Sequence, residues 1–303
     1  MKLGETMSRK GVVEIGSTNT KAYELLDNRI IDLGFKNIEF KKNYSLNNSI
    51  SAKDIEMLMD YIDNTFRGDF SVYVYATSVF REIDEEENNA IKRKLSLNPK
   101  IISFEIVSAK KENEYTVLGA LKDVSLEENT CVFVGGGGST EISICNNKKI
   151  IEMKNTNIGV GDVIKAFPDL GNEVAVTSVD TVTRYILERL QLPRLKSRYL
   201  IMAGGDFLLR YELANYPYKE NTLFSSQTHP YYITYEENRR YEDVYYHNIR
   251  LSDLKKLTPN NPNWWNGSRA MLAFTNAVAL SIGAKYLIPT RISMIYGIAN
   301  TIR

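Results

Sequence analysis

The chain has 303 residues, and its 38 basic and 37 acidic side chains leave a net charge of +1. This length exceeds the roughly 100–200 residues of one ordinary domain, so we expect two domains. A content of 43% apolar and 25% charged residues is typical of a globular protein. The near-zero net charge argues against a generic nucleic-acid binder covered with Lys and Arg, and we expect no specific DNA binding.

The charge is divided unevenly between the two halves of the chain. Residues 1–130 carry 18 basic and 22 acidic side chains, which gives −4, and residues 131–303 carry 20 and 15, which gives +5. The second half is therefore the expected place for attraction of an anion. Since no secretory signal opens the chain and no run of about 18 apolar residues occurs, we expect a soluble cytoplasmic protein without membrane binding.

Cysteine and histidine usage excludes several kinds of site. Cys131 and Cys145 are the only two cysteines, and both lie in apolar runs, so they are expected to be buried reduced thiols. His229 and His247 are the only histidines, which argues against chemistry built on paired imidazoles.

The first half reads as three antiparallel strands followed by alternating helices and strands. Ser51 with Asp54 is typical of a helix start, and apolar residues then recur at helical spacing as far as Phe66. Val- and Tyr-rich runs bounded by turn residues predict strands. The predicted strands are 11–15, 21–26, 29–35, 71–76 and 101–107, and the predicted helices are 51–66, 79–95 and 112–121.

The second half repeats this order, again with a hairpin first. A Gly-rich turn at 135–138 joins its first two strands, and a polar, Tyr-rich insertion runs to about residue 265. The predicted strands are 131–134, 141–145, 150–153, 199–203 and 285–288. The predicted helices are 161–167, 178–190, 206–215, 269–282 and 292–302.

The duplicated order predicts the fold class. Two βββαβαβα halves are typical of α/β proteins with two RNase H-like domains of the actin-like type, which face each other across a cleft. We expect domains at 1–128 and 129–303, with the last helix packing back on the first domain. Each half has a Gly/Ser/Thr turn between its first two strands, where backbone N–H groups and hydroxyls can cradle phosphate oxygens.

Four segments of the sequence carry a family resemblance. They are Glu14–Asn19, Ala76–Ser78 with Arg81, Ser108–Gly119, and Gly136–Glu141. In this order they are similar to the motifs of the exopolyphosphatase and guanosine pentaphosphate phosphatase (Ppx/GppA) family. The resemblance implies an actin-like fold and Mg²⁺-dependent hydrolysis of the terminal phosphate of inorganic polyphosphate or of guanosine pentaphosphate.

The resemblance also implies a role for particular residues. Glu112 would orient the attacking water, and Arg81 would clamp a phosphate oxygen. Glu14 and Glu141 would hold Mg²⁺, which prefers hard oxygen ligands. The implied phosphate-binding residues are Gly16, Ser17, Thr18, Gly137, Gly138, Ser139 and Thr140.

Most of these residues have a simpler explanation, whereas the role of Glu141 rests mainly on the match of the second loop. Glu112 stands in a charged run where a solvated carboxylate is ordinary, and Arg81 could pair with Asp84 or Glu85 on an acidic helix face. Lys21 would explain Glu14 as half of a salt bridge. Hairpin turns also contain Gly, Ser and Thr for purely conformational reasons.

The chain departs from the family pattern at several positions. Val134 stands where the family has a metal-binding Asp, Ala109 replaces a Gly, Asn113 replaces an Ala, and Asp206 stands in the third Gly-rich turn. These departures leave open a homologue that binds polyphosphate or guanosine penta- or tetraphosphate with little or no turnover. The segment 16–21 also resembles the first loop of actin-like ATPases and kinases, which is a third reading.

Two further points stay open on the sequence alone. The Tyr-rich segment 216–246 favours packing of its rings on the domain over stacking on nucleotide bases. Neither the choice between polyphosphate and guanosine pentaphosphate nor the formation of a homodimer follows from the residues.

Overall fold

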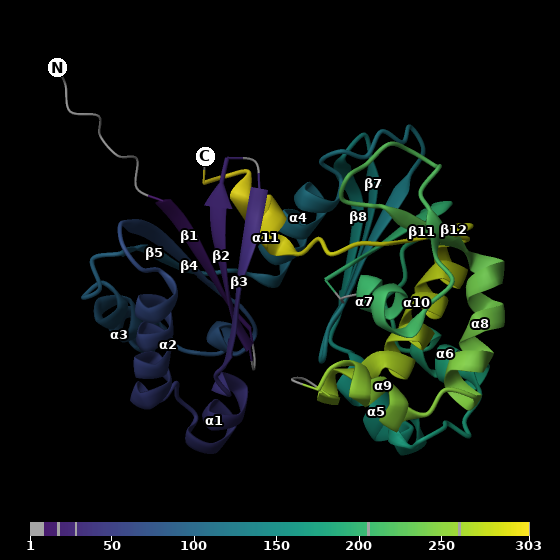
Figure 1. Cartoon of the computed structure of the whole chain (residues 1–303), viewed down its shortest axis with the longest axis horizontal. Coiled ribbons are helices and arrows are strands. Elements are labelled where there is room, and N and C mark those ends of the chain that lie inside the picture. The colour runs from purple at the N-terminus through teal and green to yellow at the C-terminus, as the bar shows by residue number, and fades with distance from the viewer. Residues whose placement is uncertain (1–8, 17–18, 28, 205–206, 260–261, 303) are drawn as a thin grey trace. The chain divides into compact units, whose positions relative to one another are not determined.

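The computed structural model describes residues 9–16, 19–27, 29–204, 207–259 and 262–302 (Figure 1). The chain divides into two compact units. Unit 1 consists of Met1–Glu112 and Ala299–Arg303, and unit 2 consists of Asn113–Ile298. Each unit contains one β-sheet with helices packed on it.

The sheet of unit 1 has the strand order β3-β2-β1-β4-β5. The hairpin strands β1, β2 and β3 are antiparallel, whereas β4 and β5 run parallel to β1. The carboxyl ends of β1, β4 and β5 consequently meet at one edge of the sheet. The strands are β1 (Arg9–Ile15), β2 (Asn19–Leu26), β3 (Arg29–Asn37), β4 (Phe70–Ala76) and β5 (Ile101–Ile106).

Helices α2 and α3 share a hydrophobic core with the sheet of unit 1 (Figure 1). The hydroxyl of Ser51 accepts the N–H of Asp54, as predicted for the start of α2, and Ile55, Leu58 and Ile62 are buried on its inner face. The helices of this unit are α1 (Phe40–Asn47), α2 (Ala52–Thr65), the 3₁₀ helix η1 (Ser78–Arg81) and α3 (Glu85–Leu95).

The sheet of unit 2 has the strand order β10-β11-β12-β9-β6-β7-β8. Strands β6, β7 and β8 form the second antiparallel hairpin set, and β9 and β12 extend the sheet in parallel with β6. The strands are β6 (Thr130–Gly135), β7 (Thr140–Asn146), β8 (Lys149–Thr156), β9 (Tyr199–Ala203), β10 (Lys219–Glu220), β11 (Tyr231–Thr234) and β12 (Tyr286–Pro289).

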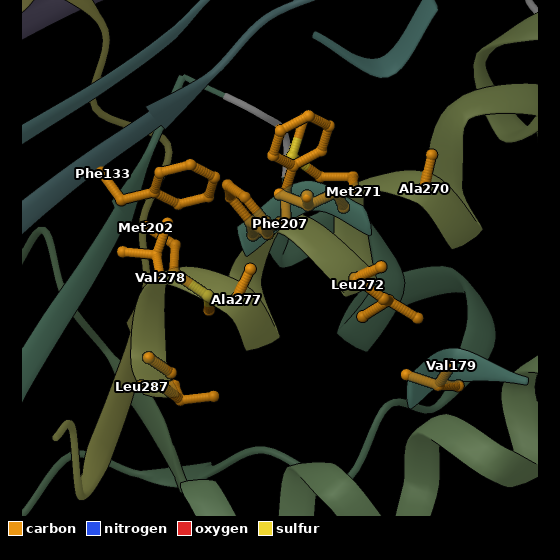
Figure 2. Packing of buried hydrophobic residues seen from close by; sticks show 14 of the residues in the cluster. Phe133, Val179, Met202, Phe207, Ala270, Met271, Leu272, Ala277, Val278 and Leu287 are labelled. Carbon is orange, nitrogen blue, oxygen red and sulfur yellow. The ribbon is translucent and has the colours of Figure 1, made fainter. Parts of the chain in front are cut away.

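Most helices of unit 2 pack on one face of this sheet. Figure 2 shows the core, in which Phe133 of β6 and Met202 of β9 lie near Phe207 of α7 and Val278 of α10. Each such buried side chain contributes about 1.5–3 kcal/mol through removal from water. The helices are α5 (Val160–Ala166), η2 (Pro168–Gly171), α6 (Val179–Leu187), α7 (Phe207–Ala214), α8 (Tyr235–His247), α9 (Leu251–Leu257), η3 (Pro262–Gly267) and α10 (Ser268–Ile282).

The other face of the second sheet is covered by α4 (Ala109–Ala120) and α11 (Met294–Ala299). Each of these helices contains a position at which the chain passes from one unit to the other. Within unit 2 the two helices are in close contact. A Cβ added to Gly297 would lie 2.0 Å from the carbonyl oxygen of Tyr115, and one added to Gly119 would lie 2.7 Å from Cβ of Tyr296. Only glycine permits this close approach of the two backbones.

Two predicted helices differ from the structure, and several helices were not predicted. The segment predicted as one helix at 79–95 is η1 followed by α3, because the Asp84 carboxylate accepts the N–H of Glu87 at 2.8 Å and starts a new helix there. The last helix is shorter than 292–302, and α1, α8 and α9 were not predicted. In the described part of the chain, the structure has no helix with the length and apolar character needed to cross a bilayer.

Candidate functional site

The carboxyl ends of three strands are tied together in unit 1. The backbone N–H of Thr77 and its Oγ1 both donate to the carbonyl of Ile15, at 2.9 and 3.1 Å. The N–H of Val107 donates to the carbonyl of Ala76 at 2.8 Å. These bonds bring the segments after β1, β4 and β5 to one edge, and each of these segments carries one of the predicted motifs.

Arg81 and Glu112 form an ion pair at this edge. The Nη2 group of Arg81 donates to Oε2 of Glu112, and its Nε donates to the carbonyl of Val107 at 2.7 Å. Glu112 stands in the first turn of α4, where its N–H donates to the carbonyl of Ser108 at 2.9 Å. The two side chains are 28% and 37% exposed, so a ligand can reach both.

The partner of Arg81 differs from the simpler explanation offered by the sequence. That explanation paired Arg81 with Asp84 or Glu85, whereas the structure pairs it with a residue 31 positions away. Asp84 instead caps α3, and its neighbours Glu85, Glu86 and Glu87 form the acidic first turn of that helix. Negative side chains are favourable at this end of a helix.

Glu14 lies on β1, opposite Lys21 of β2 and Tyr75 of β4. Its Oε2 atom is buried and has no hydrogen-bond partner among the described residues. Burial raises the pKa of Glu14, the charge of Lys21 acts against this, and the charge of Glu112 raises the pKa further. The structure thus brings Glu14, Arg81 and Glu112 together within unit 1.

A buried carboxylate oxygen without a partner is suited to a cation. Burying such an oxygen is costly unless a hydrogen bond or a positive charge compensates it. Mg²⁺ is commonly held by one or two carboxylates, with water and phosphate oxygens completing its shell. Glu14 fits this requirement, although the described residues contain no group of three or more His, Cys, Asp or Glu side chains arranged for a metal.

The first of the two loops predicted to bind phosphate begins at Gly16, directly after β1. The N–H of Gly16 donates to the carbonyl of Asn19 at 2.9 Å and closes the turn. Ser17 and Thr18, which were also predicted to bind phosphate, lie outside the described residues.

The second predicted phosphate loop, in unit 2, is closed in the same way, because the N–H of Gly136 donates to the carbonyl of Ser139 at 2.9 Å. Gly137 and Gly138 at its tip are exposed. Thr140 is buried, and its hydroxyl donates to the carbonyl of Ile158 at 2.8 Å. The loop is therefore fixed at its base and open at its tip.

Sequence reasoning missed two glycines that hold this loop. The N–H groups of Val160 and Gly161 donate to the carbonyls of Gly136 and Gly137, at 3.0 and 2.9 Å. A Cβ added to Gly159 would lie 2.4 Å from the backbone nitrogen of Gly138, so only glycine fits there. The Gly159-Val160-Gly161 pattern is a signal that could have pointed to this contact.

Glu141 and Val134 face each other across strands β7 and β6. Both are half-buried, and Val134 packs with the apolar cluster on the α4 side of the sheet. Val134 therefore supplies no oxygen beside Glu141. Asp206, another departure from the family pattern, lies outside the described residues.

The Tyr-rich segment packs inside unit 2, which confirms the interpretation favoured from the sequence. Tyr216, Tyr245 and Tyr246 are almost completely buried. The hydroxyl of Tyr216 donates to Asn238 at 2.7 Å, and that of Tyr246 donates to the carbonyl of Arg269 at 2.6 Å. These rings belong to the core and are not a surface for stacking bases.

Comparisons with known proteins agree with this architecture. The model of the Ppx/GppA phosphatase family matches residues 26–260. A comparison with curated proteins gives no match. Two crystal structures of the Aquifex aeolicus Ppx/GppA protein superpose on the chain with TM-scores of 0.72 and 0.71, at 16% and 17% identity. They cover 97% of this chain and 99% and 97% of their own chains.

An exopolyphosphatase from Cytophaga hutchinsonii has a similar structure, with a TM-score of 0.70, 16% identity and coverage of 97% of both chains. At these identities the superpositions establish the fold, and they confirm the expected class of α/β protein with two actin-like domains. The family assignment rests on the family model, which covers well over half of the sequence. The chain is a member of the Ppx/GppA phosphatase family.

Proposed function

We propose that this protein is a Mg²⁺-dependent phosphohydrolase that releases the terminal phosphate of inorganic polyphosphate or guanosine pentaphosphate. The observation that carries the proposal is the Arg81–Glu112 ion pair beside Glu14, at the edge where three strands of unit 1 end. A carboxylate and a guanidinium at one accessible edge are the groups that water-mediated phosphoryl transfer requires. Membership in a phosphatase family supports the same reaction class.

In the proposed reaction, Glu112 accepts a hydrogen bond from a water molecule and directs it at the terminal phosphorus. As the new P–O bond forms, the bond to the bridging oxygen breaks, and Glu112 takes up a proton from the water. Arg81, held by the carbonyl of Val107, shifts from Glu112 to an equatorial phosphate oxygen. The same ion pair that orients Glu112 in the free protein thus supplies the donor for the substrate.

The remaining phosphate donors come from the two Gly-rich loops. Gly16, Ser17 and Thr18 would bind phosphate in unit 1, and Gly137, Gly138 and Ser139 would do so in unit 2. Thr140 contributes by anchoring its loop to Ile158. Glu14 and Glu141 would hold Mg²⁺, which neutralises charge on the phosphate oxygens when bound.

The test is phosphate release from polyphosphate, guanosine pentaphosphate and ATP, with and without Mg²⁺. We expect release from the first two, and Glu112→Gln should lower kcat by at least about 100-fold because the base is lost. Glu114→Gln is the matched control, since Glu114 lies exposed two residues further along α4. Phosphate release that survives Glu112→Gln would contradict the proposal, and hydrolysis of ATP alone would favour an actin-like ATPase.

A second candidate function is favoured by Val134. This apolar residue faces Glu141 and contributes no metal ligand, so a protein that binds polyphosphate or guanosine penta- or tetraphosphate with little turnover fits the same observations. Val134→Asp separates the two candidates. If the wild type is almost inactive and Val134→Asp releases phosphate much faster, the natural protein is a binding protein. If the wild type is active and Val134→Asp is no faster, that second candidate is excluded.

A further inference from the structure

Asn113 is a buried amide with one unsatisfied end. The side chain is 2% exposed, and its Nδ2 donates to Oγ of Ser143 at 2.8 Å. Its Oδ1 is buried without a hydrogen-bond partner among the described residues. A buried acceptor without a partner is destabilising, and a bound water or ion is one way to satisfy it.

The position of this amide is set by two contacts within unit 2. Ser143 lies two residues beyond Glu141 on β7, so their side chains share one face of the sheet. Their Cα atoms are separated by about 7 Å along the strand. The close contact of Tyr115 with Gly297 fixes α4 against the same face, and Asn113 is therefore held above the strand that carries Glu141.

The surrounding side chains limit which atoms can bind a cation on this face. Glu141 faces Val134 and Ser143 faces Val132 across the β6–β7 ladder, and neither valine has an oxygen to offer. On this face β7 thus offers the Glu141 carboxylate and the Ser143 hydroxyl, to which the amide of Asn113 is bonded, and Asn155 of β8 faces Glu141 from the other neighbouring strand. An Asn carbonyl is an established ligand for hard divalent cations.

We propose that Oδ1 of Asn113 and the carboxylate of Glu141 bind one divalent cation together. The inference deepens the proposed function, on which the role of Glu141 rests. The amide oxygen supplies, from the helix side, the ligand that Val134 does not supply from the strand side. The hydrogen bond from Asn113 to Ser143 places the amide on the face of β7 that carries Glu141. A neutral amide makes this site less negative than a pair of carboxylates would.

The experiment measures Mn²⁺ binding to the full chain by electron paramagnetic resonance, without any phosphate compound. We expect Asn113→Ala and Glu141→Gln each to weaken Mn²⁺ affinity by roughly tenfold or more, the scale on which loss of metal-site groups acts. Asn113→Asp keeps an oxygen at the same place and adds charge, so it should bind Mn²⁺ at least as tightly as the wild type.

Asn146→Ala is the matched control. It removes an amide on the same strand, where Nδ2 of Asn146 donates to Oδ1 of Asn129 at 3.0 Å, away from Glu141. This variant should keep the wild-type Mn²⁺ affinity. Circular dichroism verifies that each variant is folded, and if Asn113→Ala does not fold, Asn113→Asp decides alone.

Several results would overturn the inference. They are wild-type affinity in Asn113→Ala, weaker binding in Asn113→Asp than in the wild type, or no Mn²⁺ binding by the wild type. The phosphate-release panel tests the proposed function separately. A protein that releases no phosphate, yet loses Mn²⁺ affinity in Asn113→Ala, would support the cation site and reject the hydrolase.

Discussion

His229 is completely buried in a polar cluster within unit 2. The hydroxyls of Ser226 and Thr228 donate to the two carboxylate oxygens of Asp123, at 2.8 and 2.9 Å. Nδ1 of His229 lies 2.9 Å from both hydroxyl oxygens. Because both hydroxyl hydrogens are directed to Asp123, Nδ1 must carry the hydrogen. Ser226 and Asp123 both lie on the Nδ1 side of His229. In a nucleophilic triad the nucleophile and the acid face different ring nitrogens, so this cluster is structural and not catalytic.

Burial lowers the pKa of His229 to about 4, and the charge of Asp123 offsets only part of this effect. The unfolded chain, with a His pKa near 6.5, binds more protons than the folded protein between about pH 4 and 6.5. The free energy of unfolding should therefore fall as the pH drops through this window, by up to about 3 kcal/mol from this residue.

The measurement is urea unfolding of wild type and His229→Asn between pH 4 and 7. The variant lacks the titrating group, so its free energy of unfolding should depend less on pH. His247→Asn, the variant of the other histidine, is measured in parallel as the control. Equal slopes for wild type and His229→Asn would show that His229 does not carry the effect.

At the scale of elements, the contact between the second predicted phosphate loop and the start of α5 depends on Gly159. A Cβ there would lie within 2.7 Å of backbone atoms of Gly136, Gly137 and Gly138. Since backbone atoms cannot move aside as a flexible side chain can, Gly159→Ala should displace the loop. Overpacking of this kind costs about 1–3 kcal/mol.

We expect Gly159→Ala to lower the Tm and to raise KM for any phosphate substrate. Gly171→Ala is the matched control, since a Cβ at Gly171 meets nothing within 4 Å and should leave both quantities nearly unchanged. Calorimetry and phosphate-release kinetics supply the two readouts. An unaltered KM in a folded Gly159→Ala protein would count against a phosphate-binding role for this loop.

Local patterns predicted most elements and missed others for identifiable reasons. The start of α2 was predicted correctly because the N-cap Ser51 and the helical spacing of the apolar residues after it are both local signals. The break at Asp84 was missed because an acidic run looks like a continuous helix unless the capping bond is known. Helix α1 was missed because it has only one buried residue, Phe40, and hence almost no apolar periodicity.

At the scale of the whole molecule, two arginines of unit 2 are buried inside the fold and a third is held in an ion-pair network. Arg269 donates to four backbone carbonyls between 2.7 and 3.0 Å, and both Arg269 and Arg210 are 1% exposed. Arg239 pairs with Glu242 and Asp180. Part of the positive charge of unit 2 is therefore used in buried hydrogen bonds and ion pairs. This part is not available on the surface to bind a long anion.

This use of the basic residues leads to a prediction about substrate length. If only the terminal phosphates are bound, kcat/KM for each chain should change by less than about tenfold between tripolyphosphate and polyphosphate of on the order of a hundred units, because tenfold corresponds to only 1.4 kcal/mol of added contact. Phosphate release at equal chain concentration provides the comparison. A steep gain with length, lost at high salt, would instead indicate an extended basic track.

The sequence by itself determined the local elements, the duplicated hairpin-first order and the resemblance to a phosphatase family. Turn residues, caps and apolar spacing act over a few positions, and they are visible without any folding. The motif around Glu112 was recognisable in the same way, because its residues are neighbours in the chain.

Only the tertiary structure decided which of these residues meet. Arg81 reaches Glu112 because β4 and β5 run parallel to β1, so their following segments end at one edge. The unsatisfied oxygen of Asn113 and the crowding at Gly159 likewise depend on segments far apart in sequence. Such contacts depend on which strands pair and which helices pack together across long separations in the sequence. The spacing of residues along the chain does not specify these partners.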